Sequence, residues 1–146
     1  MWGVDANGGI QYKETLASKT KTVPGKLKQV EVGQFGVFGV TSKNKVLYRK
    51  GTHGNCGSMG SEWQEVEGSL THISVGVDNV WGVNSNDEVY TMEKVTFSDD
   101  EISFSWKRIG GLLKHIKTNG SPLDLTNPTA GTLYYTGILQ CHHFKL

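Results

Sequence analysis

The fold is decided by a stretch that recurs along the chain, VEGSLTHISVG at residues 66–76. It matches VPGKLKQVEVG at residues 23–33 and, over a shorter length, IGGLLKHI at residues 109–116. Equivalent positions in successive copies lie 43 residues apart, and Trp63 and Trp106 share that offset. Self-similarity at a fixed period of this length is the sequence signature of a repeat architecture.

A second block, VWGVNSNDEVY at residues 80–90, recurs in the same way, with related text at residues 2–12 and 38–48. Each copy has two short apolar segments around a turn rich in Asn and Asp, which is typical of a β-hairpin. Together with the strands of the first block, a repeat of roughly 40 residues would hold four short antiparallel strands. The pattern predicts an all-β fold, a β-propeller of about three four-stranded blades that form part of a ring.

Within each copy we expect a fixed order of strands. The hairpin comes first, with its Trp-Gly-Val strand innermost, and a polar loop follows it. The tryptophan strand is expected third, and the Leu-x-x-Ile-x-Val-Gly strand fourth, in the same blade. Gly3, Gly39 and Gly82 are expected to let backbones approach closely near the axis. Residues 1–120 would hold the repeats, and residues 121–146 a non-repeat tail with one extra strand or no fixed structure.

Composition fits this fold and excludes some partners. The chain has 19 glycines among 146 residues, nearly twice the usual share of about 7%, which favours many turns. The net charge is +1, so no strong field would hold nucleic acid or an anionic membrane. No apolar run reaches the roughly 18 residues of a membrane span. The two cysteines, Cys56 and Cys141, do not define a compartment.

Residues 80–90, together with WKRIGGLLKHI at residues 106–116, carry a family resemblance. The chain resembles the tectonin β-propeller family and, within it, the fish-egg lectins. The resemblance implies a closed propeller, usually six-bladed. It also implies a lectin that recognises sugars or bacterial surface glycans, lipopolysaccharide included, through multivalent blade-loop sites. A secreted protein of innate immunity or egg protection follows from the resemblance alone.

The length departs from that family pattern, because a six-bladed ring needs about twice as many residues. Half a ring has open strand edges, which invite self-association. We therefore expect either a truncated gene product, which the abrupt start favours, or half of a dimeric ring. Residues 1–5 do not resemble a signal peptide, so either the natural start is missing or the protein is cytosolic. The alternative functions are an intracellular tectonin-type interaction module and an inactive truncated fragment.

Candidate carbohydrate-binding residues combine an aromatic face with polar groups that can bind hydroxyls. Packing between blades is the competing interpretation for the aromatic residue, turn formation for the Asn and Asp residues, and a solvated strand face for the cations. The candidates are Trp81, Asn84, Asn86, Asp87, Lys107 and Arg108.

Other chemistry finds little support in the sequence. No nucleophile is paired with a base, and no phosphate-binding or dinucleotide fingerprint is present, so we expect that the chain is not an enzyme. His72 and His115 occupy equivalent repeat positions and would lie in different blades. The acidic run at residues 99–101 could contribute to a calcium site, but calcium needs several convergent oxygens. We expect no cofactor beyond this open possibility of calcium.

Overall fold

The structure is a computed structural model that describes residues 1–116, and the regular elements of this part are all β-strands. They form one sheet of three strands and two sheets of four, all antiparallel. The first sheet contains β1 (Trp2–Val4), β2 (Gly9–Tyr12) and β3 (Lys21–Lys26); the second contains β4 (Gln29–Gly33), β5 (Gly36–Val40), β6 (Lys45–Arg49) and β7 (Trp63–Ser69); the third contains β8 (His72–Val75), β9 (Val80–Val83), β10 (Glu88–Ser98) and β11 (Glu101–Leu112).

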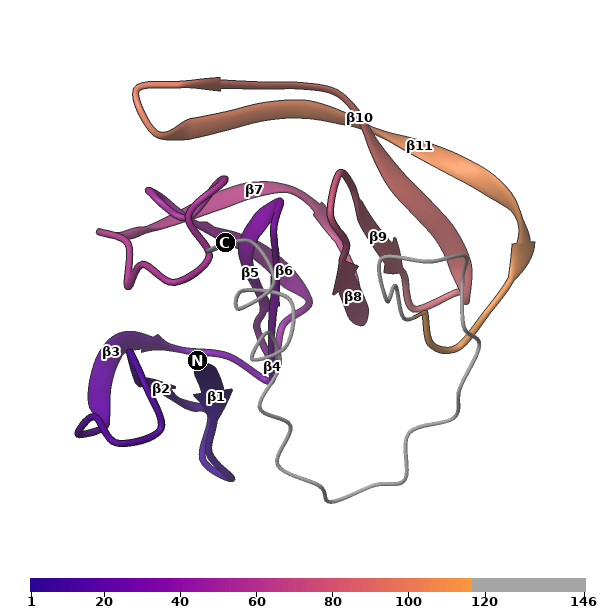
Figure 1. The fold of residues 1–146 in the computed structure, drawn as a ribbon. Helices are drawn as coiled ribbons and strands as arrows, with labels where there is room; N and C mark the ends of the chain where they lie inside the picture. The colour runs from indigo at the N-terminus through magenta and orange to yellow at the C-terminus, as the bar shows by residue number, and fades with distance from the viewer. Residues whose placement is uncertain (117–146) are drawn as a thin grey trace.

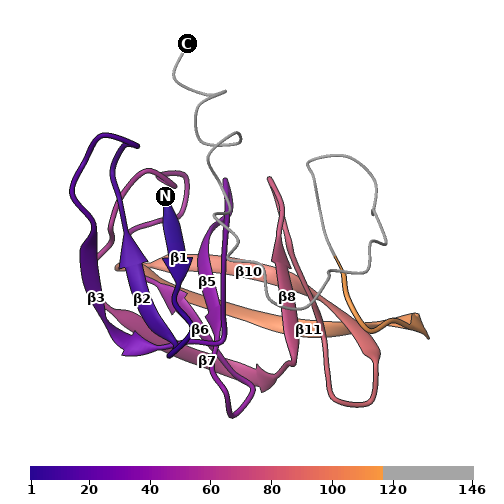
Figure 2. The ribbon, with the colours of Figure 1, turned by 90° about the horizontal axis from the view of Figure 1, so that it is seen from below.

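The three sheets stand side by side in chain order, each with one face against the next (Figures 1 and 2). Apolar side chains fill both spaces between sheets, with Trp2 and Phe38 fully buried. The prediction of an all-β partial propeller is therefore confirmed. The predicted tail, residues 121–146, lies outside the described residues.

The grouping of strands into sheets differs from the expectation. The Leu-x-x-Ile-x-Val-Gly strand does not close its own blade, because β4 pairs with β5 and β8 pairs with β9. Each of these strands is therefore the first strand of the following sheet. The crossing between sheets takes only two residues after β3, and Lys28 N then donates a hydrogen bond to Val40 O at 2.8 Å. In the second and third sheets, the strand that carries this Gly-Val motif (β5 and β9) is consequently second, not innermost.

The glycine of the Trp-Gly-Val strand is required by a side chain and not by a neighbouring backbone, which corrects the second expectation. A Cβ at Gly39 would lie 2.4 Å from Leu27 Cδ1, and one at Gly82 would lie 2.3 Å from Leu70 Cδ1. Both leucines are almost completely buried. The leucine two residues before β4 and the one two residues before β8 therefore pack into the space that the glycine leaves.

The segment expected to be a polar loop in the third copy is an extended hairpin. The strands β10 and β11 are joined at Asp99 and Asp100, and their hairpin reaches past β7 (Figure 1). Apolar side chains of this hairpin alternate with polar ones and pack against the second sheet. They include Met92, Val95, Phe97, Ile102 and Phe104. The burial of this alternating face explains why the strands continue beyond Thr91.

Tryptophans on the outer strands connect adjacent sheets. Trp106 Nε1 donates a hydrogen bond to Glu67 O at 2.6 Å, and the Trp106 ring covers Gly68. Gly68 has φ +117° at a bulge in β7, where a Cβ would also meet the indole nitrogen. Trp63 meets Trp2 of the first sheet edge to face at 5.9 Å. These contacts agree with a structural role for Trp63 and Trp106.

Candidate functional site

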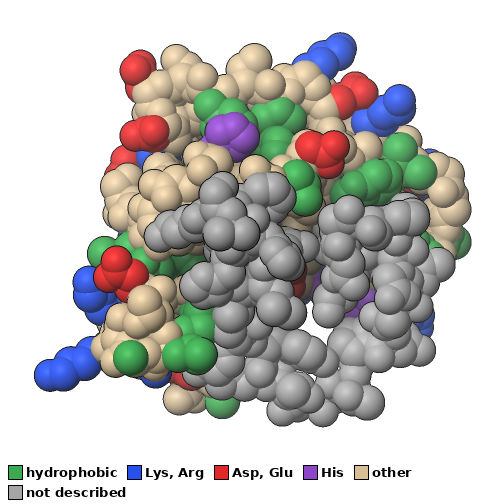
Figure 3. Space-filling view, in the orientation of Figure 1, with side chains coloured by type: hydrophobic (Ala, Val, Ile, Leu, Met, Phe, Trp, Pro, Cys, Tyr) green, Lys and Arg blue, Asp and Glu red, His purple; other side chains and the backbone are tan. Residues whose placement is uncertain are grey.

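A cleft lies between the second and third sheets, beside the tip of the β10–β11 hairpin. Its volume is about 400 Å³. Figure 3 shows hydrophobic and histidine side chains gathered on one face of the molecule, with acidic side chains nearby. We call this site the inter-sheet cleft, and its lining residues are Tyr48, Gly51, His53, Asn55, Phe97, Asp99 and Asp100.

Aromatic side chains form one wall of the inter-sheet cleft. The His53 ring is stacked on the Phe97 ring, with centroids 3.7 Å apart and planes 17° from parallel. Phe35 meets His53 edge to face at 5.4 Å, and Tyr48 lies 5.8 Å from Phe97. Tyr48 is buried, and this burial raises the pKa of its hydroxyl. His53 itself is exposed, so the wall offers aromatic surface to a ligand.

The loop that carries His53 is fixed by hydrogen bonds to the second sheet. Thr52 Oγ1 accepts a bond from Val37 N at 2.9 Å and donates one to Arg49 O at 2.6 Å. His53 Nδ1 lies 2.9 Å from Phe35 O. Because a carbonyl oxygen only accepts, the Nδ1–H of His53 is the donor of this bond.

The tip of the hairpin contributes the acidic side of the inter-sheet cleft. Asp99 and Asp100 both have positive φ, 49° and 64°, and they form a two-residue turn between Ser98 and Glu101. Both carboxylates are exposed. Among residues 1–116 neither carboxylate forms a hydrogen bond or an ion pair. They therefore remain available as acceptors for a ligand.

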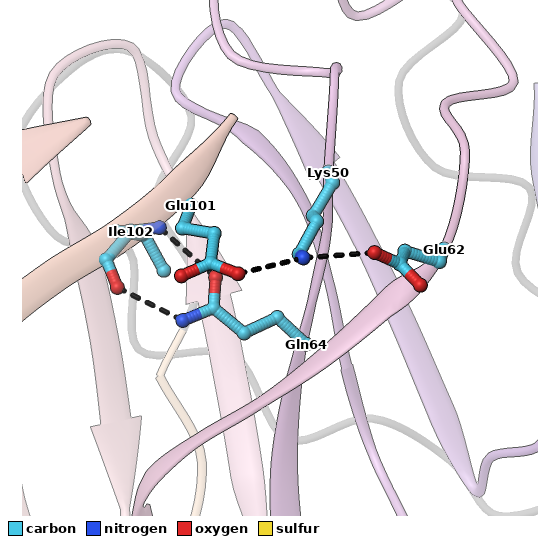
Figure 4. Close-up of polar contacts among 5 residues, drawn as sticks. All are labelled: Lys50, Glu62, Gln64, Glu101 and Ile102. Atoms are coloured by element: carbon cyan, nitrogen blue, oxygen red, sulfur yellow. Dashed lines mark hydrogen bonds and ion pairs between the residues drawn. The ribbon is translucent and has the colours of Figure 1, made fainter. Parts of the chain in front are cut away.

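Two polar contacts fix the hairpin to the second sheet, as Figure 4 shows. Gln64 Nε2 donates to Ile102 O at 3.0 Å, and Gln64 Oε1 accepts from Ile102 N at 2.9 Å. Lys50 Nζ bonds Glu62 at 2.8 Å and Glu101 at 2.9 Å. These two partners, Glu62 first, raise the pKa of Lys50. The contacts hold the acidic turn at a fixed place beside the aromatic wall.

The structure places part of the sequence-predicted set in the turn before β10. Asn84 Oδ1 accepts from the backbone N of Asn86 and of Glu88, both at 3.0 Å, and Asp87 has φ 63°. Asn84 Nδ2 donates to Glu88 Oε2 at 2.7 Å, and Arg108 pairs with Glu88 Oε1 at 2.9 Å. The bond from Asn84 and then the Arg108 charge lower the pKa of Glu88. This arrangement joins Asn84 and Arg108, which are 24 residues apart, through Glu88.

The remaining two candidates, Trp81 and Lys107, lie on the face of the third sheet opposite to Arg108. Trp81 pairs with Thr91, and Thr91 pairs with Lys107, so the three occupy one row across β9, β10 and β11. Trp81 is partly exposed, whereas the equivalent Trp2 and Phe38 are fully buried against the next sheet. The predicted candidates therefore form two groups and not one site.

A comparison with family models decides the family. The tectonin domain model matches residues 1–123. The chain belongs to the tectonin domain family. Tectonin domains are of a non-enzymatic β-propeller type, in agreement with the sheets described above. No curated protein matches the chain.

Sequence reasoning missed most of the inter-sheet cleft of this tectonin domain. Asp99 and Asp100 were recognised as an acidic run, but Tyr48, His53 and Phe97 were not connected with it. An available signal was the alternation of apolar and polar residues at 95–98 and again at 102–105, which is typical of strands. Recognising that long hairpin would have placed its acidic tip beyond the third sheet.

The histidines and acidic residues of the tectonin domain have other partners. His72 Nε2 lies 2.9 Å from Ile116 O, and the His115 ring is 4.9 Å away. Within residues 1–116 no group of three or more His, Cys, Asp and Glu is placed to hold a metal ion. Glu101, the third member of the acidic run, binds Lys50. In the same range, no helix is long and apolar enough to cross a membrane.

Proposed function

We propose that this tectonin domain is a carbohydrate-binding lectin, similar to the fish-egg lectins, for sugars or bacterial surface glycans. The inter-sheet cleft carries the proposal, because the stacked rings of His53 and Phe97 stand beside the carboxylates of Asp99 and Asp100, which have no ion pair within residues 1–116. An aromatic face packs on the apolar face of a pyranose ring, while carboxylates and amides bind its hydroxyls. The volume of about 400 Å³ is within the usual range for small ligands.

The residues first identified from the sequence supply further contacts in this proposal. Trp81 and Lys107 share one row of the third sheet, and Asn86 stands exposed in the adjacent turn. Several weak sites on one rigid body would bind a repetitive glycan surface, such as lipopolysaccharide, through avidity.

An extracellular role in innate immunity belongs to the same proposal. It is supported by the resemblance to the fish-egg lectins, which implies a secreted protein. Secretion of the protein from cells that express its complete gene would support this role. Retention in the cytosol would instead favour an intracellular interaction module.

The test of binding is an array of glycans that includes bacterial lipopolysaccharides, probed with the folded 146-residue chain. The proposal expects reproducible binding to a restricted set of sugars. A folded protein that binds nothing on the array overturns it.

Two matched asparagine variants then locate the site. Asn55→Ala removes an exposed amide of the inter-sheet cleft, and Asn86→Ala removes an exposed amide of the turn before β10. If the inter-sheet cleft is the main sugar site, Asn55→Ala lowers the affinity more than Asn86→Ala does. The reverse pattern would assign binding to the turn.

A further inference from the structure

We propose that the inter-sheet cleft selects sugars that carry a free ammonium group over neutral, acetylated or acidic sugars. The inference rests on the proposed lectin function and adds a ligand class to it. Charge and hydrogen-bonding capacity in the cleft carry the argument.

The inter-sheet cleft has negative charge that no cation of the described residues neutralises. Asp99 and Asp100 are exposed, and in the range 1–116 neither is paired. Lys50, which binds Glu101 next to this turn, is already shared between Glu62 and Glu101. A ligand ammonium group would therefore meet two carboxylates without displacing an existing partner. A sulfated or carboxylated sugar would be repelled by the same pair.

The polar groups of the cleft are mostly acceptors. Asp99 and Asp100 contribute two carboxylates, which only accept hydrogen bonds. An ammonium group offers three N–H donors and no acceptor, so it matches this set. An acetamido group offers one N–H donor together with a carbonyl oxygen, and that oxygen would face other acceptors in the cleft.

The aromatic wall adds a second preference for a cation on a sugar ring. The stacked His53 and Phe97 rings present a rigid aromatic surface at the cleft. The face of a Phe or Tyr ring attracts an ammonium group, and an aromatic face also packs on the apolar face of a pyranose. An amino sugar provides both features in one residue, whereas a flexible lysine side chain provides only the charge.

The experiment compares the β-1,4-linked glucosamine tetrasaccharide with its fully N-acetylated counterpart by titration calorimetry. Measurements are made at a pH at which the amines are protonated. The folded protein should bind the amine form at least about tenfold more tightly, with a preference that falls as salt rises. Tetralysine, with the same number of side-chain ammonium groups and no sugar ring, should bind more weakly than the amine tetrasaccharide.

The double variant Asp99→Asn, Asp100→Asn removes the charges while keeping the turn, because Asn tolerates positive φ well. It should abolish the preference for the amine form. The control Asp78→Asn removes an equally exposed carboxylate from another loop and should keep the preference.

The outcomes separate this inference from the lectin proposal. Equal or tighter binding of the acetylated tetrasaccharide, or an unchanged preference in the double variant, overturns the inference and leaves a lectin. Tetralysine that binds as tightly as the amine tetrasaccharide overturns recognition of the sugar ring. Failure to bind either tetrasaccharide overturns the inference, and a negative glycan array in addition overturns the lectin function.

Discussion

Gln29 in the second sheet binds both backbone groups of Ile73 in the third sheet. Gln29 Nε2 donates to Ile73 O at 2.9 Å, and Gln29 Oε1 accepts from Ile73 N at 3.0 Å. The side-chain amide thus takes the place that a backbone partner would have in a sheet. The same relationship recurs at the other end of the second sheet, between Gln64 and Ile102. Two glutamines therefore connect the second and third sheets, one at the first strand and one at the last.

Replacing Gln29 by Ala should destabilise the protein by about 1–3 kcal/mol, because it leaves the N–H and C=O of the buried Ile73 without partners. The free energy of unfolding in urea measures the effect. Gln34→Ala is the matched control, since the Gln34 side chain forms no hydrogen bond with another residue in the range 1–116. An equal loss in both variants would contradict the role assigned to Gln29.

Gly39→Ala should destabilise the protein by about 1–3 kcal/mol through overpacking, since the new Cβ would lie 2.4 Å from Leu27 Cδ1. Thermal unfolding provides the measurement. Gly57→Ala is the control, because a Cβ there meets nothing within 4 Å. Adding Leu27→Ala to Gly39→Ala should cost less than the two single losses together, because the new methyl group partly fills the cavity. Strictly additive losses would show that the two residues do not share this space.

Much of the fold could be predicted from the repeats, but the grouping of strands could not. The turn at Asn84 and the hairpin around it follow from local sequence, because Asn and Asp form such turns wherever they stand between apolar strands. Whether a strand joins the preceding or the following sheet is a different question. Both connections of β4 are short, so the outcome depends on Leu27 packing into the space at Gly39 across two strands.

The candidate site was predicted less well, for a related reason. The inter-sheet cleft brings Tyr48 and His53 together with Phe97, Asp99 and Asp100. Their proximity depends on the length of the β10–β11 hairpin and on the two sheets being packed against each other. Neither quantity can be obtained from motif spacing. The predicted Trp81 and Lys107 did fall in one row, because residues that pair across adjacent strands share a face.

His72 should make stability depend on pH. Burial is the largest influence, and it lowers the His72 pKa to about 4 from 6.5. The His72 Nε2 bond to Ile116 O opposes the shift, and the charges of His115 and Lys28 add to it. The folded state therefore favours the neutral ring, so stability is complete above pH 6.5 and is lost as pH falls towards 4. The loss should amount to at most about 3 kcal/mol.

Unfolding in urea at several pH values tests this, with His72→Gln as the comparison. Gln at this position would be equivalent to Gln29 and could bind the backbone of Ile116 without a titrating group. The variant should keep most of the stability at pH 7 and lose much of the pH dependence. A pH dependence identical to that of the unchanged protein would show that another group titrates.

Gln64→Leu should loosen the acidic turn while leaving the rest of the third sheet in place. The substitution keeps an apolar stem but removes both bonds to Ile102, so it should cost about 1–3 kcal/mol of stability. Amide hydrogen exchange at Ile102 should become faster, because its N–H loses the bond to Gln64 Oε1. The amide of Ile73 serves as an internal control, since Gln29 still protects it.

Ligand affinity at the inter-sheet cleft should fall as well, because Asp99 and Asp100 would no longer be held beside the aromatic wall. Faster exchange at Ile73 and Ile102 alike would instead indicate a general destabilisation and contradict a local role for Gln64.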